Sequence, residues 1–343
     1  IYRSADQGVT FSQKVALIGG GSLARSTPHE VTVSREAPDT LYLAAAEGLF
    51  RTTTAGDRWF RLPLPAKDVL SVSVHPKNSQ ILLAAVISDA QNGRGKILKS
   101  LTGGTSWAEV FTAPAGEQLQ GTIIQRRRET PTIVTTLAHD PLQPEVVLAG
   151  TNQGTLLGSG DGGIRWTTLF SVREGITGIK FSTTVPDLLF IRLASGRLLR
   201  SADGGRSADQ VLLGREPGAS FDAPLGTAQD GSAVHAVAFL RSAAADQERV
   251  LAGTENGLLK SEDGGMNWAP LPLPPTGGTT HIPVRTLAES ADGTLWAGSG
   301  SVISISKDGG LTWRSSEAPL RRTLRFVLTD PVRAERLYAF FEP

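Results

Sequence analysis

Short apolar runs separated by turns rich in Gly, Pro, Asn and Asp make up most of this chain. Runs of about four to six residues with such borders are typical of β-strands. Many runs come in pairs joined by a glycine-containing turn, such as 41–45 with 48–51 and 295–298 with 302–305. A further run precedes each pair, and a turn with proline often follows it, as His75-Pro76 follows 69–74. This pattern predicts an all-β fold.

An octapeptide, which we call the blade turn, follows these pairs and recurs seven times. Its pattern is Ser or Thr, any residue, Asp, any residue, Gly, any residue, a polar residue and an aromatic residue. The copies occupy 4–11, 52–59, 100–107, 159–166, 201–208, 261–268 and 306–313. The aspartates are Asp6, Asp161, Asp203, Asp263 and Asp308, and the tryptophans are Trp59, Trp107, Trp166, Trp268 and Trp313. The copies lie about 50 residues apart on average, a repeat length typical of propeller blades.

Each repeat predicts four antiparallel strands, because the aromatic residue opens a fourth run, as in 107–111. We therefore expect residues 1–343 to form a single β-propeller domain with seven four-stranded blades. The last repeat ends after two strands, and residues 1–11 supply the missing strand and blade turn. The two ends of the chain are expected to share the last blade, which leaves no open sheet edge at the seam.

The seven octapeptides resemble Asp-box repeats, also called BNR repeats. These occur in sialidases, sortilin-type receptors, some glucanases and photosystem assembly factors of the Ycf48 and HCF136 type. The resemblance covers the whole chain and implies that each box is the hairpin turn between the third and fourth strands of a blade. The residue types suit such a turn, because a short carboxylate accepts backbone N–H groups and glycine takes positive φ.

We interpret the aspartates and tryptophans of the blade turns as structural residues. The alternative is calcium binding, since hydroxyls and Asp-x-Gly loops can bind Ca²⁺. Thr54 and Thr102 replace the aspartate in two copies, which disfavours that alternative.

Composition narrows the functions that we expect. The 34 Lys and Arg balance 33 Asp and Glu, so no overall charge favours nucleic acid as a partner. The chain has no cysteine, and its five histidines show no short metal-ligand spacing, so we expect neither a metal nor another cofactor. No apolar run approaches the roughly 18 residues of a membrane span.

The chain opens on Ile1, without a methionine, directly in strand-like sequence. This start indicates that an upstream segment is missing, and either a cleaved signal peptide or a fragment boundary accounts for it. We expect an extracytoplasmic protein, which is periplasmic, lumenal or secreted, with a targeting segment that this chain does not include.

Loops opposite the blade turns are the expected binding surface. Segments 112–132 and 213–232 are long connections between blades, and 87–96 is an irregular loop of the same face. Long irregular loops on a rigid scaffold are frequent sites of binding. The candidate binding residues are Asp89, Arg94, Arg126, Arg127, Arg128, Arg215 and Asp222. The arginine triplet can grip an acidic partner or a phosphate, or it can be a solvated loop.

A second group of candidate residues, all with ionisable side chains, lies near the predicted starts of first strands. These residues either line the channel as a ligand site or are charges that pair with one another. Its members are Asp68, Glu174, His281, Arg285 and Arg322.

Enzymatic members of the family set two tests for this chain. A sialidase needs a tyrosine nucleophile and a Phe/Tyr-Arg-Ile-Pro motif, whereas His281-Ile282-Pro283 lacks the arginine and Tyr2, Tyr42 and Tyr338 fall within predicted strands. A glucanase of the two-propeller kind places its carboxylates across a cleft between two rings, and this chain predicts one ring.

The resemblance to the Ycf48 type in size, single ring and number of boxes favours a non-catalytic scaffold. We expect it to bind a protein partner through its loop face, as an assembly or accessory factor of a larger complex, including one associated with a membrane. The alternative is a secreted carbohydrate-active propeller, either a glycoside hydrolase or a glycan-binding protein.

Overall fold

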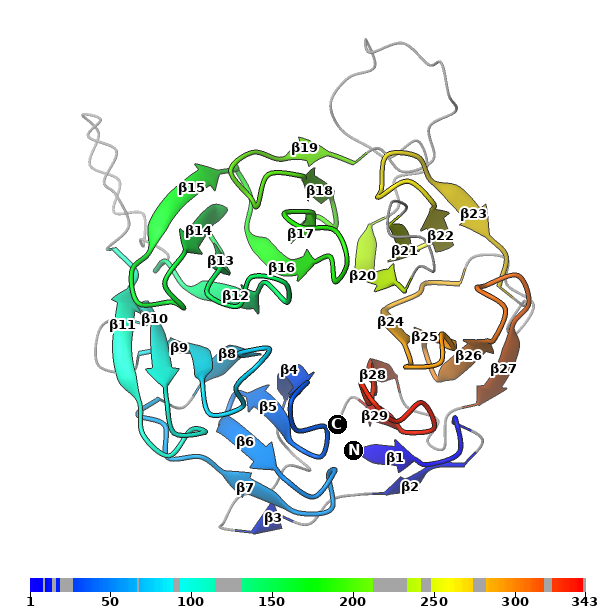
Figure 1. The fold of residues 1–343 in the computed structure, drawn as a ribbon, viewed down its shortest axis with the longest axis horizontal. Coiled ribbons are helices and arrows are strands. Elements are labelled where there is room, and N and C mark those ends of the chain that lie inside the picture. The colour runs from blue at the N-terminus through cyan, green and yellow to red at the C-terminus, as the bar shows by residue number, and fades with distance from the viewer. Residues whose placement is uncertain are drawn as a thin grey trace, which may run out of the picture.

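A computed structural model describes residues 1–8, 10–13, 17–18, 27–66, 68–88, 93–114, 131–211, 233–241, 248–273, 282–317 and 323–341. Within these ranges every regular element is a β-strand. Seven antiparallel sheets stand around a central channel (Figure 1). The predicted seven-bladed β-propeller is therefore confirmed.

The strands of each blade follow one another from the channel outward. The first strands are β4 (Pro28–Val33), β8 (Val69–Val74), β12 (Val134–His139), β16 (Ile176–Phe181), β20 (Val234–Leu240), β24 (Thr286–Glu289) and β28 (Leu324–Thr329). The second strands are β5 (Leu41–Ala45), β9 (Leu82–Ile87), β13 (Val147–Thr151), β17 (Leu189–Leu193), β21 (Arg249–Thr254), β25 (Leu295–Ser299) and β29 (Leu337–Phe341). The third strands are β6 (Gly48–Thr52), β10 (Gly95–Ser100), β14 (Thr155–Ser159), β18 (Leu198–Ser201), β22 (Gly257–Ser261), β26 (Val302–Ser306) and β1 (Tyr2–Ser4). The fourth strands are β7 (Trp59–Arg61), β11 (Ala108–Thr112), β15 (Thr167–Ser171), β19 (Asp209–Gln210), β23 (Ala269–Leu271), β27 (Arg314–Glu317) and β2 (Ser12–Gln13). We number the blades 1 to 7 from the one that contains β4.

Apolar second strands hold neighbouring blades together, because both of their faces are buried. Side chains alternate between the two faces of a strand. In β9, Leu82 packs toward blade 1, where it joins the cluster around Tyr42. Its neighbour Leu83 packs toward blade 3, in the cluster that contains Val147. The continuous apolar runs of the sequence thus form the contacts between blades.

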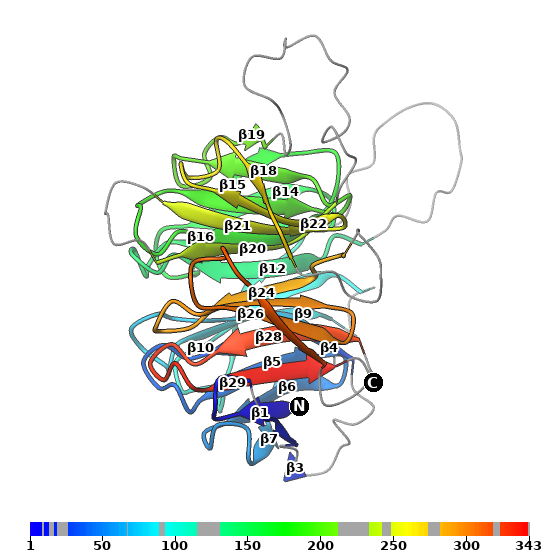
Figure 2. The ribbon, with the colours of Figure 1, turned by 90° about the vertical axis from the view of Figure 1, so that its right-hand side faces the viewer.

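Blade 7 is built from both ends of the chain, as predicted. Its sheet has the order β2-β1-β29-β28, and Tyr2 pairs with Ala339. Strands run between the two faces of the ring in the side view of Figure 2, and β1 starts at the same face as β29 ends. Blade 1 differs from the four-strand expectation, because β3 (Leu17–Ile18) adds a fifth strand parallel to β7. This short strand covers part of an otherwise open sheet edge.

The blade turns join third strands to fourth strands and share one hydrogen-bond pattern. In the copy at 261–268, Ser261 Oγ accepts the backbone N–H of Gly265 at 2.7 Å. Asp263 Oδ1 accepts the backbone N–H of Asn267 at 2.9 Å, and Trp268 Nε1 donates to the Gly265 carbonyl at 3.0 Å. Where threonine replaces aspartate, Thr54 Oγ1 accepts the N–H of the residue four positions later. The oxygens of these turns are therefore occupied by donors of the turn itself.

Candidate functional site

The first strands form the wall of the central channel, and polar side chains join them to one another. Glu30 Oε2 of β4 accepts the backbone N–H of Val72 in β8 at 3.0 Å. At the equivalent place in the next pair of blades, Ser71 Oγ accepts the N–H of Leu137 at 2.9 Å. These bonds cross from one blade to the next, so the channel wall is a continuous, hydrogen-bonded surface.

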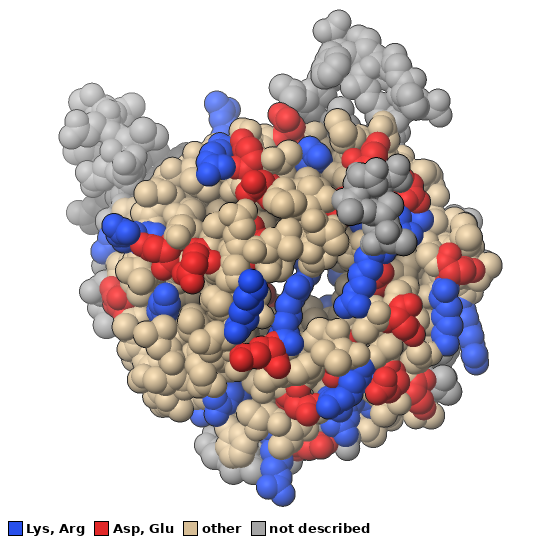
Figure 3. All heavy atoms as spheres, in the orientation of Figure 1, with Lys and Arg blue, Asp and Glu red and all other residues tan. Residues whose placement is uncertain are grey.

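Three cationic side chains meet where the channel opens on the blade-turn face. First strands run parallel to third strands and so end at the face where the blade turns begin. Lys180 is the second-last residue of β16, next to this face. Arg241 directly follows β20, and Arg35 follows β4 by two residues. Figure 3 shows Lys and Arg side chains gathered around the channel opening. We call Arg35, Lys180 and Arg241 the channel mouth.

The charges of the channel mouth act on one another across the channel. The surrounding protein and the Arg241 charge lower the pKa of Arg35, and the surrounding protein and the Arg35 charge lower the pKa of Lys180. All three side chains are solvent-accessible, but channel walls enclose them, so water screens their charges less than on an open surface. These residues come from blades 1, 4 and 5 and repel one another.

Neither Arg35 nor Lys180 has a hydrogen bond or ion pair to another described residue. Arg241, by contrast, is held in place, because its Nη1 donates to the Ala291 carbonyl at 2.9 Å. Its backbone N–H also donates to Glu289 Oε2 at 2.8 Å. The mouth therefore presents one fixed guanidinium and two cations without a protein partner.

Two carboxyl groups lie in the same part of the channel, and both bind protons more readily than usual. Burial raises the pKa of Glu30 to about 7, although hydrogen bonds from Ser71 and Val72 act in the opposite direction. Burial also raises the pKa of Glu289. Burial thus favours the protonated form of both carboxyl groups and weakens the negative charge that they offer to the mouth.

A serine-histidine contact elsewhere in the wall has the residue types of a catalytic dyad. Ser73 Oγ lies 2.7 Å from Nδ1 of His139, and the backbone N–H of His139 donates to the same oxygen at 3.1 Å. Both side chains are buried, and burial followed by the nearby His75 lowers the pKa of His139 to about 3. This contact joins blades 2 and 3 and leaves the hydroxyl with little access to the channel.

The described ranges contain no group of three His, Cys, Asp or Glu side chains placed to hold a metal ion. No helix that could cross a membrane is found in them either.

Most of the binding residues predicted from the sequence lie outside the described residues. These are Asp89, Arg126, Arg127, Arg128, Arg215 and Asp222. Arg94 is described and lies just before β10, where its carbonyl accepts the N–H of Ser88 at 3.0 Å. Its Nε is buried without a hydrogen-bond partner. The loop surface as a binding site stays a prediction.

The second group of candidates consists of paired charges wherever the structure describes it. Asp68 lies 3.1 Å from His29, and Glu174 accepts Nε of Arg197 at 2.6 Å. Arg285 lies 3.8 Å from Glu255. All three partners lie outside the predicted group, so its described members do not pair with one another as the sequence had allowed. His281 and Arg322 lie outside the described residues.

Sequence reasoning missed the channel mouth entirely. Its three residues stand in three different blades, far apart along the chain, and belong to no repeated motif. One feature of the sequence could have indicated it. Arg35 and Arg241 each follow the end of a first strand closely, and first strands end on the face that carries the blade turns.

Comparisons with known proteins support the fold. No family model and no curated protein matches the chain. A solved GH74 xyloglucanase from Xanthomonas campestris superposes with a TM-score of 0.67 and 16% identity, over 96% of this chain and 52% of the enzyme. This chain thus spans about half the length of that structure.

Two further solved structures match over nearly their whole length. YCF48 bound to D1 peptide has a TM-score of 0.61 and 16% identity, over 93% of both chains. YCF48 from Cyanidioschyzon merolae has a TM-score of 0.59 and 16% identity, over 92% of this chain and 95% of that one. At such identities the likeness shows the fold alone. The chain is a seven-bladed β-propeller, an architecture shared here by an enzyme and by a protein bound to a peptide.

Proposed function

We propose that this protein is a non-catalytic scaffold that binds a protein partner at the channel mouth. The observation that carries the proposal is the convergence of Arg35, Lys180 and Arg241 at the channel opening, where neither Arg35 nor Lys180 has a hydrogen bond or ion pair to a described residue. A partner that brings the complementary charge gains both affinity and orientation.

An extended segment of the partner fits this location better than a folded surface does. The three cations stand around the channel opening, where an extended segment can place a single carboxylate among them. The match to YCF48, which was solved with a D1 peptide and resembles this chain over its full length, supports a peptide as the bound form. Within this proposal the protein is an accessory factor of a larger complex, and its extracytoplasmic location stays a prediction.

The carbohydrate-active alternative rests on the likeness to the GH74 xyloglucanase. Glycoside hydrolysis needs two carboxyl groups free to act as acid and as base or nucleophile. Glu30 and Glu289, in the channel, each accept a backbone N–H, from Val72 and from Arg241. This occupation, together with the coverage of only half of the enzyme, favours the scaffold.

Affinity capture from the source organism tests the proposal. The Arg35→Gln/Arg241→Gln protein is compared with wild type and with Arg58→Gln, which removes an exposed guanidinium from a blade turn of the same face. We expect the double substitution to lose a specific partner that wild type and Arg58→Gln retain. Equal capture by all three would place the partner elsewhere, and turnover of an aryl glycoside would favour the hydrolase.

A further inference from the structure

The channel mouth has the properties of an anion site whose occupancy is linked to a proton. We infer that it receives an oxyanion, such as a peptide carboxylate, and that Glu30 takes up a proton as this anion binds. This inference rests on the proposed function for the location of the partner and adds the chemistry that the partner must present.

The cations supply the first part of the argument. Like charges that repel one another inside a walled channel are stabilised by an anion placed between them. Neither Arg35 nor Lys180 forms an ion pair with a described residue, although the Glu30 charge acts on Lys180. Arg241 donates to the Ala291 carbonyl. Guanidinium and ammonium groups form their strongest hydrogen bonds with carboxylate and phosphate oxygens.

Glu30 is the acidic residue that responds to the bound anion. It lies in blade 1 and Lys180 in blade 4, yet their opposite charges attract each other, which places both side chains on the shared channel. An anion bound beside Lys180 faces the Glu30 carboxylate and repels its charged form. Protonation of Glu30 removes this repulsion and leaves its carbonyl oxygen able to accept the N–H of Val72.

Few other titrating groups face Glu30 from the elements around it. Its own strand carries His29, which is bonded to Asp68, and the connection after the strand carries Arg35. Strand β8, packed against β4, has no ionisable side chain, and Ser71 is the polar group that it offers to Glu30. From β28, on the other side, Arg325 is the ionisable residue. The Lys180 charge acts on Glu30 across the channel. Glu289 of β24, which accepts the N–H of Arg241, is a second acid of the channel whose pKa burial raises.

Defined probes can test the anion site without knowledge of the partner. A tetramethylrhodamine-labelled hexaglutamate peptide presents carboxylates, hexaglutamine with the same label is its neutral control, and sulfate represents a free oxyanion. Hexaglutamate and sulfate do not titrate between pH 6 and 8, so a change in affinity in that range belongs to the protein. Fluorescence anisotropy in bis-Tris and imidazole buffers, whose cations do not compete for the site, gives the affinity.

Wild type should bind hexaglutamate and not hexaglutamine, and affinity should fall as pH rises from 6 to 8. One linked proton limits this fall to about tenfold per pH unit. Arg35→Gln and Lys180→Gln should each weaken binding by roughly tenfold, the usual effect of losing a charged hydrogen bond. Arg58→Gln should bind as wild type does.

Glu30→Gln is the decisive variant, because glutamine keeps an oxygen for the Val72 N–H and cannot take up a proton. It should bind at pH 8 at least as tightly as wild type and show a weaker pH dependence. Calorimetry at pH 7 in two buffers of different ionisation enthalpy should detect less proton uptake in Glu30→Gln than in wild type. A pH slope and a proton uptake as large in Glu30→Gln as in wild type overturn the link to Glu30.

Wild-type affinity for hexaglutamate in Arg35→Gln and Lys180→Gln overturns the anion site as a whole. Should Glu30→Gln fail to fold by circular dichroism, the two cation variants and wild-type calorimetry decide the same question. Binding of sulfate without hexaglutamate supports the oxyanion site and contradicts the proposed peptide partner. Binding of hexaglutamate without capture of any partner supports the site while the proposed scaffold function fails, so the two outcomes are distinguishable.

Discussion

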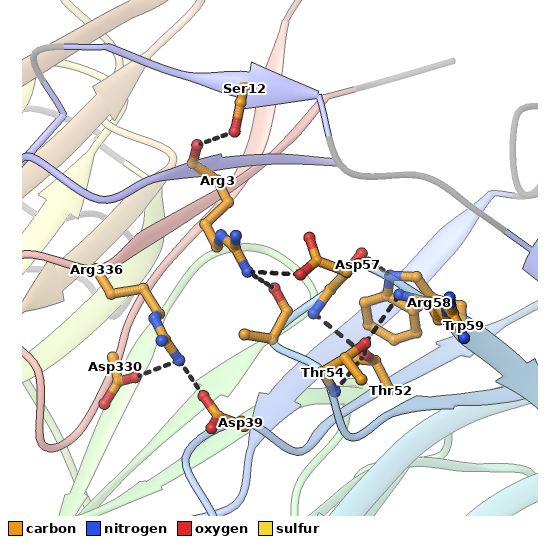
Figure 4. A network of polar contacts seen from close by, with 12 residues as sticks. Arg3, Ser12, Asp39, Thr52, Thr54, Asp57, Arg58, Trp59, Asp330 and Arg336 are labelled. Atoms are coloured by element: carbon orange, nitrogen blue, oxygen red, sulfur yellow. Dashed lines mark hydrogen bonds and ion pairs between the residues drawn. The ribbon is translucent and has the colours of Figure 1, made fainter.

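Arg3 of β1 donates a hydrogen bond from Nη1 to the carbonyl oxygen of Ala55, at 2.9 Å, and so joins blade 7 to blade 1 (Figure 4). Ala55 is the fourth residue of the blade turn in blade 1, and Arg3 directly precedes the blade turn of blade 7. The same contact recurs between other blades, from the residue before one blade turn to the fourth residue of the next. Its further examples are Arg51 to Gly103 at 2.7 Å, Lys99 to Gly162 at 2.8 Å and Arg200 to Gly264 at 2.7 Å. The blade turns are thus also joints between neighbouring blades.

This contact should contribute measurably to stability. Because Arg3 also lies 3.5 Å from Asp57, Arg3→Gln removes two links between blade 7 and blade 1. We expect the free energy of unfolding to fall by about 1–2 kcal/mol, the usual effect of losing a hydrogen bond from a charged group. Urea denaturation measures it, with Arg314→Gln in the outer strand β27 as the matched control. A change no larger than in the control would assign the joint between blades 7 and 1 to their apolar contacts alone.

A glycine in the blade turn should tolerate no side chain. Gly265 has a φ of 89°, and a Cβ there would lie 2.3 Å from the ring of Phe190 in blade 4. Gly265→Ala therefore adds backbone strain to overpacking, and we expect a loss of about 2–4 kcal/mol. Gly160→Ala is the control, since a Cβ there meets nothing within 4 Å. Equal midpoints of thermal unfolding for the two variants would contradict this account.

His139 should make the protein less stable in mild acid. Burial keeps this side chain neutral and lowers its pKa to about 3, whereas an unfolded histidine titrates near 6.5. Between these values the unfolded state binds a proton that the folded state does not, so stability falls as pH falls from about 6.5 to about 3. The unfolding equilibrium shifts by up to about tenfold per pH unit from this one group.

His139→Asn provides the comparison, because its side chain can still accept the Ser73 hydroxyl and does not titrate. Its stability should depend less steeply on pH between 6.5 and 4 than that of wild type, as urea midpoints at several pH values would show. Parallel curves for the two proteins would place the acid sensitivity elsewhere.

Partner binding at the channel mouth should depend on salt. Charges that meet across solvent are screened over about 10 Å at 0.1 M salt and over about 3 Å at 1 M. We therefore expect captured partner to decrease as salt rises, and the remaining binding of Arg35→Gln/Arg241→Gln to vary less with salt. Retention of the partner by wild type at 1 M salt would indicate an apolar interface instead.

Ring closure should require the N-terminal strands. Removing residues 1–13 deletes β1 and β2 and exposes the edge of β29, which pairs with β1 at Tyr2 and Ser4. An open edge strand favours association between chains. We expect the truncated protein to form oligomers in size-exclusion chromatography, and a stable monomer would show that the edge needs no partner strand.

The number of blades, their four strands and the shared last blade could be predicted from the sequence, because those features repeat locally. Glycines at regular spacing, such as Gly104, Gly163 and Gly265, mark the blade turns. Continuous apolar runs such as 82–86 form strands in each repeat, independently of the neighbouring repeats. The incomplete last repeat predicted the seam for the same reason. Each of these properties depends on residues that lie close together in the sequence.

Only the tertiary structure decided which charges meet. Arg35, Lys180 and Arg241 become neighbours because closing the ring brings the ends of three first strands around one opening, a relation that no spacing along the chain encodes. The same holds for Arg3 and Ala55, which depend on how far one blade is turned against the next. The parallel strand β3 is too short to leave a pattern and forms only where the edge of β7 is in reach. Local repetition therefore determines the architecture, whereas long-range packing places the charged groups that we propose to be functional.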